Sequence, residues 1–255
     1  MTRVVPLASG SRGNATLVEF GCTRLLVDAG LSARELGRRL GQIGVPPAAI
    51  DGILLSHEHN DHARGARRFS RLHGTPVFCS VATLEAMDCS PAHFAEWRPL
   101  EPGRRLGLGE LEIEAFPVPH DAAAPVGFVL HGGGVRIGIA TDLGHVSTLI
   151  IERLRGCQLL MVESNHDDRM LQQGPYSWQL KQRVSGRLGH LSNREAALLL
   201  QETVDDGCRA VVLAHLSEKN NTRELAQRSA RAAMGHRRPE ILVATADVPL
   251  RPICL

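Results

Sequence analysis

Four side chains that can ligate a metal fall within six residues, in the segment His57-x-His59-x-Asp61-His62. They follow the apolar run at residues 53–55, which is typical of a short buried strand. A turn after a strand can splay alternate side chains, so that one pair faces one metal ion while Asp61 and His62 face a second. Neutral imidazole and carboxylate suit Zn²⁺, and Mn²⁺ or Fe also accept them. A polar turn with a helix cap is the alternative, but it leaves the number of ligands at this spacing unexplained.

Other polar residues stand where apolar runs end, namely Asp28, His120, Asp142 and His215. A lone histidine after a strand is more often hydrogen-bonded than metal-bound, but several such positions occurring together indicate a metal site. The six cysteines include no C-x-x-C pair, which indicates reduced core thiols instead of a zinc ribbon.

The elements that must position these residues are expected to be strands in the first part of the chain and alternating strands and helices in the later part. A helix capped by Ser32 is expected, and the stretch 88–109 is interpreted as an irregular surface connection. Strands are expected at residues 4–8, 16–20, 24–27, 53–55, 76–79, 111–118, 127–130, 135–140, 159–162, 210–213 and 241–244, and helices at 63–73, 82–87, 193–204 and 222–233, with a helical region after Asn165. Mixed sheets covered by helices on their outer faces fit this order.

The chain has 255 residues, of which 43% are hydrophobic, and we expect one domain spanning residues 1–255. A net charge of +2 excludes a highly basic tail-type nucleic-acid binder but not a local basic patch. The apolar runs are far shorter than the ~20 residues of a membrane span, and the first residues show no leader pattern. We therefore expect a cytoplasmic protein without a membrane partner, and the oligomeric state stays open, a homodimer included.

The metal motif resembles the signature of the metallo-β-lactamase fold family. The resemblance implies an α/β architecture, a four-layered αββα sandwich of two mixed β-sheets flanked by helices. It also implies that His57, His59 and His120 hold one divalent ion, that Asp61, His62 and His215 hold the other, and that Asp142 bridges the two. Asp28 is similar to a buried aspartate of this family that orients the loop at His57.

Nearly the whole chain resembles the YycJ/WalJ-like group of this family, through segments such as residues 7–14, 163–167 and 214–221, and its closing third also resembles ribonuclease Z. This resemblance implies a 5′-to-3′ exonuclease acting on DNA. It places His190 near the scissile phosphate, as phosphate ligand or general acid, with Glu163 as its partner. The alternative for His190 is a helix-capping turn that uses Ser192 or Asn193.

The resemblance implies two metal ions about 3.5–4 Å apart, Zn²⁺ or Mn²⁺ with Fe as an alternative. These ions would activate a bridging water as hydroxide, and Asp61 is expected to be essential for catalysis. The competing hypothesis is a small-molecule hydrolase of the same fold that cleaves a cyclic phosphodiester, a thioester or a lactone. A non-catalytic binding module is less consistent with the complete ligand set.

Substrate contacts are expected from a few polar residues near these motifs, Ser11, Asn14, His166, Lys181 and Lys219. The Gly-rich loop at residues 9–14 offers backbone N–H groups for an anion, although a hairpin needs no such role. A stripe of arginines at i, i+3, i+4 and i+7 follows the metal motif, formed by Arg64, Arg67, Arg68 and Arg71. It could track phosphates or be an ordinary solvated helix face.

Overall fold

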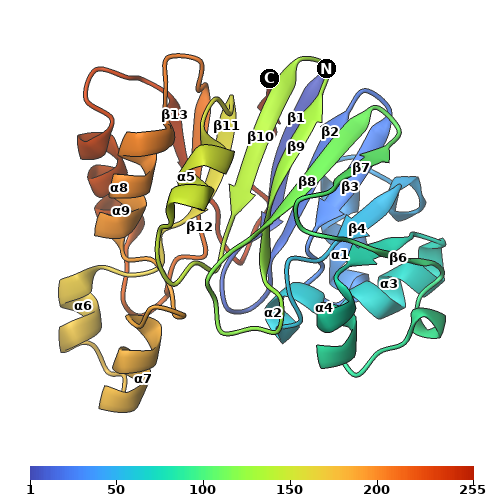
Figure 1. Ribbon diagram of the computed structural model, residues 1–255, viewed down its shortest axis with the longest axis horizontal. Helices are drawn as coiled ribbons and strands as arrows, with labels where there is room; N and C mark the ends of the chain where they lie inside the picture. The colour runs from blue at the N-terminus through green and yellow to red at the C-terminus, as the bar shows by residue number, and fades with distance from the viewer.

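Two mixed seven-stranded sheets stack face to face in the computed structural model, which describes residues 1–255 (Figure 1). The order in the first sheet is β14 (Ile253–Cys254), β1 (Thr2–Ala8), β2 (Ala15–Phe20), β3 (Thr23–Val27), β4 (Gly52–Leu54), β5 (Val77–Cys79), β6 (Trp97–Pro99). The order in the second is β13 (Glu240–Val243), β12 (Ala210–Ala214), β11 (Leu159–Glu163), β10 (Val135–Ala140), β9 (Val126–Gly132), β8 (Leu111–Pro117), β7 (Arg105–Leu108). Pairing is antiparallel from β14 to β3 and from β7 to β10, and parallel from β3 to β6 and from β10 to β13.

Helices cover both outer faces of this pair of sheets (Figure 1). The first sheet carries α1 (Ala33–Gln42), α2 (Asn60–Ala63), α3 (Ala66–His73) and α4 (Val81–Ala86). The second carries α5 (Thr148–Leu154), α8 (Asn193–Thr203) and α9 (Arg223–Ala233), while α6 (Asp168–Gln173) and α7 (Trp178–Val184) project beyond its edge. The predicted αββα sandwich of mixed sheets is therefore confirmed.

Strand alternation explains why the protein has three apolar layers. Val4 of β1 packs between the sheets, whereas its neighbour Val5 packs under the helices of the first sheet. Met161 of β11 likewise lies between the sheets, and Val162 lies under the helices of the second. Successive side chains of a strand point to opposite faces, so strands buried on both faces must be apolar throughout. This accounts for the continuous apolar runs in the sequence.

Some expected boundaries are wrong. The stretch 88–109 is not a plain connection, because it contains the edge strands β6 and β7, whose largely exposed side chains lack an apolar signal. The sequence interpretation also missed α5 and β14. The helix expected at 63–73 is divided into α2 and α3 at Gly65, where an added Cβ atom would lie 2.0 Å from the carbonyl oxygen of Leu31.

The parallel strands end at one edge of the sandwich, and the polar residues singled out in the sequence follow them there. Asp28 follows β3, Asp142 follows β10, and His215 follows β12. The carboxyl ends of parallel strands meet at a common edge, so residues far apart in the chain converge. No helix has the length and apolarity needed to cross a lipid bilayer.

Candidate metal centre

Two clusters of potential metal ligands lie side by side at this edge. Four overlapping groups of ligand atoms lie within 4.8 Å of one another, and two of these groups include Asp142, namely His57, His62, Asp142 and Asp142, Glu163, His190, His215. The two groups without Asp142, here called the two clusters, are His57, His59, His120 and Asp61, His62, His215. Asp142 lies between them. Its carboxylate is 3.1 Å from Nε2 of His62, 3.2 Å from Nδ1 of His215 and 3.8 Å from Nε2 of His120. The structure thus brings together every residue that the sequence indicated as a ligand.

The buried polar atoms of this centre fit a metal ion. Nε2 of His120, Nε2 of His215 and Oδ2 of Asp142 are shielded from solvent and have no hydrogen-bond partner of good geometry. A buried polar atom without a partner is destabilising, and such atoms are rare in folded proteins. A divalent cation would satisfy all three, because imidazole nitrogen and carboxylate oxygen are its usual ligands.

The backbone at the strand ends is strained in the same way at three site residues. Asp28, Asp142 and His215 have φ angles of 62°, 58° and 53°, in the left-handed region that residues other than glycine seldom adopt. Strain of this kind persists only where the surroundings enforce it, and it clusters at functional sites. Here it turns each side chain from the strand end into the centre.

Asp28 acts as a buried anchor behind the metal motif. One of its carboxylate oxygens accepts the backbone N–H of Ser56 at 2.8 Å, and the other lies 2.7 Å from Nδ1 of His62. The hydroxyl of Ser56 in turn lies 2.9 Å from Nδ1 of His57. Asp28 therefore orients His62 directly and His57 through Ser56, whereas the sequence interpretation named only the loop at His57.

Asn14 was expected to contact substrate, but it is buried and holds the site together. Its side-chain amide reaches the carbonyl oxygen of Asp61 at 3.2 Å and Nε2 of His62 at 2.9 Å. Its backbone N–H donates to the same Asp61 oxygen at 2.7 Å, and its carbonyl accepts from Gly30 at 2.8 Å. The loop at residues 9–14 thus packs against the metal motif through main-chain contacts.

Gly30 lies in this contact, and we expect Gly30→Ala to damage the site. An added Cβ atom would lie 1.6 Å from the carbonyl oxygen of Asp61, so the Asp61 loop would have to move. The free energy of unfolding should fall by about 1–3 kcal/mol, as overpacking commonly costs, and bound metal should decrease. Thermal denaturation and elemental analysis measure both. Gly41→Ala in α1, where a Cβ atom meets nothing within 4 Å, is the matched control; equal behaviour of the two variants would contradict this account.

Glu163 is a buried acceptor that links His190 to the metal cluster. Its Oε1 lies 2.7 Å from Nδ1 of His190 and 3.0 Å from Nδ1 of His215. Its Oε2 accepts the backbone N–H groups of Leu143 and Leu191 at 2.6 and 3.2 Å. Glu163 is fully buried, so it cannot touch a substrate and acts through the two histidines. The sequence interpretation of Glu163 as the partner of His190 agrees with this geometry.

Charges in the centre are strongly coupled. Burial disfavours charge on His215, but the surrounding carboxylates of Asp142, Asp61 and Glu163 outweigh burial and raise the pKa of His215 to about 10. Burial would raise the pKa of Glu163, yet the charge and hydrogen bond of His190 lower it to about 2. Burial and the neighbouring His62 lower the pKa of His57. The metal-free centre is therefore held by a protonated imidazole among carboxylates.

Metal binding at pH 7 should consequently release protons. Because the metal-free protein keeps His215 protonated up to about pH 10, a ligating His215 must lose its proton, and metal affinity should rise with pH through this range. The raised pKa stabilises the metal-free fold fully below the unshifted value of 6.5, and this stabilisation is lost as the pH rises through about 10. Calorimetric titration of Zn²⁺ in Pipes and in Tris measures the release; a binding enthalpy independent of buffer would contradict it.

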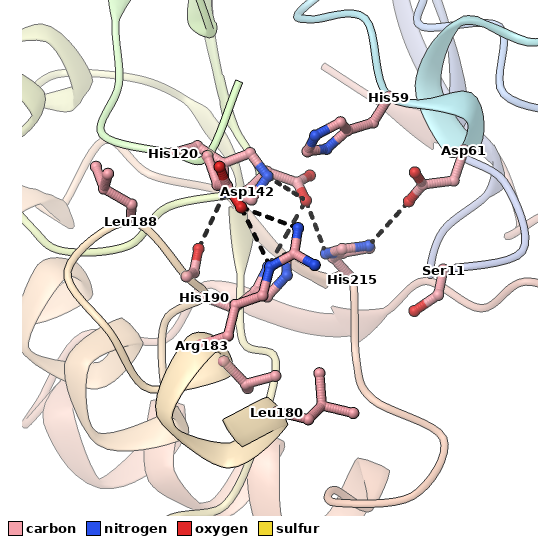
Figure 2. Close-up of a pocket in the computed structure, with 13 residues that line it drawn as sticks. Ser11, His59, Asp61, His120, Asp142, Leu180, Arg183, Leu188, His190 and His215 are labelled. Carbon is pink, nitrogen blue, oxygen red and sulfur yellow. Dashed lines mark hydrogen bonds and ion pairs between the residues drawn. The ribbon is translucent and has the colours of Figure 1, made fainter. Parts of the chain in front are cut away.

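A pocket of about 240 Å³, here called the central pocket, opens over the ligands (Figure 2). His190 and His215 face it from one side and His59, Asp61 and Ser11 from the other. One wall of the pocket, here called the α7 wall, is formed by α7 and the turn after it, and comprises Leu180, Arg183, Val184 and Leu188. Sequence analysis missed the apolar residues of this wall and also Asp121, which pairs with Arg183 at 2.9 Å. The exposed leucines of this segment were the available signal.

The other expected substrate contacts lie away from the central pocket. His166 is buried, with its backbone bridged to Ser192. Lys181 points from α7 toward α6, where its amino group donates to the carbonyl of Gln172 at 2.7 Å. Lys219 is exposed and lines neither the central pocket nor its neighbours. Of the five expected contact residues, only Ser11 borders the pocket.

Comparison with known proteins identifies relatives over most of the chain. The family model described as Beta-lactamase superfamily domain matches residues 23–216. Exodeoxyribonuclease WalJ of Streptococcus pneumoniae is 36% identical over 224 residues, 86% of this chain and 83% of the relative. Exodeoxyribonuclease YycJ of Bacillus anthracis is 36% identical over 229 residues, 88% and 85% of the two chains. The crystal structure of the metallo-beta-lactamase fold protein YhfI from Bacillus subtilis has a TM-score of 0.75 at 17% identity, covering 98% of this chain and 99% of that one.

Proposed function

The chain belongs to the beta-lactamase superfamily and has the metallo-β-lactamase fold, and from this premise we propose that it is a metal-dependent 5′-to-3′ exodeoxyribonuclease. The observation that carries the proposal is the pair of ligand clusters around Asp142, next to a histidine that faces the same pocket. The names of the two curated relatives, which match over most of their length, support DNA as the substrate.

The ligand clusters suggest how two divalent ions would be held. We assign one ion to His57, His59 and His120, the other to Asp61, His62 and His215, and a bridging position to Asp142. Zn²⁺ and Mn²⁺ both accept this donor set. Bound there, the ions would activate water for attack and offset the negative charge that develops on the phosphate.

His190 is placed to assist the leaving group. Its Nδ1 is engaged by Glu163, which leaves Nε2 as the ring nitrogen available to the central pocket. The charge of Glu163 contributes to raising the pKa of His190 against the effect of burial, which favours the protonated imidazole. We infer that it donates this proton to the departing sugar oxygen, and that Glu163 positions it and keeps it charged.

The test combines metal content with product analysis. Purified protein is assayed with Zn²⁺ or Mn²⁺ on single- and double-stranded DNA and RNA, each labelled once at the 5′ and once at the 3′ end. A 5′-to-3′ exonuclease releases labelled mononucleotide from 5′-labelled DNA in its first step. It shortens 3′-labelled DNA one nucleotide at a time, which gives a descending ladder of labelled strands. Internal fragments as first products would contradict the proposal. Bound metal with hydrolysis only of a thioester, lactone or cyclic phosphodiester reporter would favour the small-molecule alternative.

A further inference from the structure

A groove runs from the rim of the central pocket onto the arginine stripe of α2 and α3. It has a volume of about 510 Å³, and its lining includes Glu58, His59, Arg64, Arg67, Arg68 and Met87. His59 lines both the groove and the central pocket. A second recess shares Ser11 and Asp61 with the central pocket and Arg64 with the groove, and Arg12 and Asn60 complete its lining. We call this feature the arginine groove, and it is continuous with the metal centre.

The local fold aims the three arginines into the groove. The buried face of α3 carries Ala66, Phe69 and Ser70, so Arg67 and Arg68 must point outward. Gly65 allows the turn between α2 and α3 to pack directly on Leu31. The arginines are therefore fixed relative to the metal motif, which ends at α2.

The charges in the groove are unneutralised. Arg64, Arg67 and Arg68 form no ion pair, and the guanidinium of Arg64 makes one hydrogen bond, to the carbonyl of Arg12 at 3.4 Å. Glu58 is the one acidic residue in the lining, and its Oε1 is engaged by the backbone N–H of Ala123 at 2.8 Å. A row of free guanidinium groups beside a carboxylate-poor surface is suited to binding phosphates.

The other exits from the central pocket offer no free positive charge. At the α7 wall, Arg183 is paired with Asp121, and the remaining side chains there are apolar. Beside Ser11, Arg12 is paired with both Glu218 and Asp247. A polyanionic strand that places one linkage at the metal centre is therefore attracted toward α3 and not toward α7.

We propose that the arginine groove binds the phosphate backbone of the uncleaved part of the DNA strand, while the terminal nucleotide occupies the central pocket against α7. This inference rests on the proposed nuclease function and adds the path of the substrate. It also gives a structural reason for attack at an end, because the α7 wall, whose one cation is already paired, borders the pocket on the side away from His59 and the groove.

The test measures DNA binding without turnover. A fluorescent single-stranded decanucleotide is titrated into His190→Ala protein over 50–300 mM NaCl, with and without Arg64→Gln, Arg67→Gln and Arg68→Gln together. Each lost phosphate contact reduces the slope of log K against log salt concentration by about 0.7 for single strands, so the slope should fall by about 2. The triple lysine replacement keeps the charge and should keep most of the slope. Arg223→Gln, Arg228→Gln and Arg231→Gln on α9 together are the matched control, and they should leave it unchanged.

The outcomes separate this inference from the proposed function. A slope that is unchanged in the glutamine variant, or reduced equally by the α9 control, would overturn the groove assignment even if DNA is hydrolysed. With His190 intact, the glutamine variant should lose more kcat/KM on a decanucleotide than on a dinucleotide, and equal losses would also overturn it. Wild-type protein that hydrolyses neither DNA substrate would instead overturn the nuclease proposal.

Discussion

Asp142→Asn should lower the metal content of the purified protein and reduce DNA hydrolysis by at least about 100-fold. Mutation of residues that only support metal ligands already costs up to about 100-fold, and Asp142 is assigned as a ligand itself. The Asp142 carboxylate lies 3.1 Å from Nε2 of His62 in one cluster and 3.8 Å from Nε2 of His120 in the other. Asparagine has the same shape and tolerates the left-handed backbone at this position, so the substitution removes charge with little added strain. The loss can then be assigned to the metal centre.

The measurement is elemental analysis of the variant together with turnover of 5′-labelled DNA. Circular dichroism should show an intact fold. Asp121→Asn is the matched control, because Asp121 borders the same pocket but is exposed and pairs only with Arg183. Asp121→Asn should retain its metal. Wild-type metal content and full turnover in Asp142→Asn would refute the bridging assignment.

Sequence information was sufficient for the metal motif because its ligands are neighbours in the chain. His57, His59 and His62 follow one strand, so their types and spacing indicate metal binding without knowledge of the fold. Asp142 and His215 follow different strands, and nothing local distinguishes them from ordinary strand-end residues. They could be assigned only through the family resemblance, which supplies the order of the parallel strands.

The sequence interpretation failed where a role depends on packing direction. Asn14 was placed in the substrate site because its Gly-rich loop offers backbone N–H groups to an anion, but Asn14 is buried where Gly30 closely approaches the Asp61 loop. Lys181 was expected to contact substrate, yet the rotation of α7 turns Lys181 toward α6, whereas Arg183 lines the pocket. Two positions along a helix turn a side chain to nearly the opposite face, and residue type does not reveal which face lines the pocket.

His190→Ala should lower kcat on DNA by about 10²–10⁴-fold, the usual contribution of a general acid, while the metal content stays at the wild-type level. The loss should be much smaller for a p-nitrophenyl ester of a mononucleotide, because its leaving group departs without protonation. His145→Ala is the matched control, since His145 lies near the pocket but outside its lining, with Nδ1 3.0 Å from the carbonyl of Arg187. Equal losses on both substrates would show that His190 binds phosphate and does not transfer a proton.

Glu163→Gln distinguishes positioning from a purely structural role. The carboxylate of Glu163 contributes to raising the pKa of His190 against the effect of burial, so its neutralisation should lower that pKa. A general acid is active while protonated, and the alkaline limb of the kcat–pH profile should therefore move to lower pH in Glu163→Gln. Metal content must be measured in parallel, because Glu163 also lies 3.0 Å from His215. A lower rate with an unshifted alkaline limb would mean that Glu163 supports the fold of the site and does not set the protonation of His190.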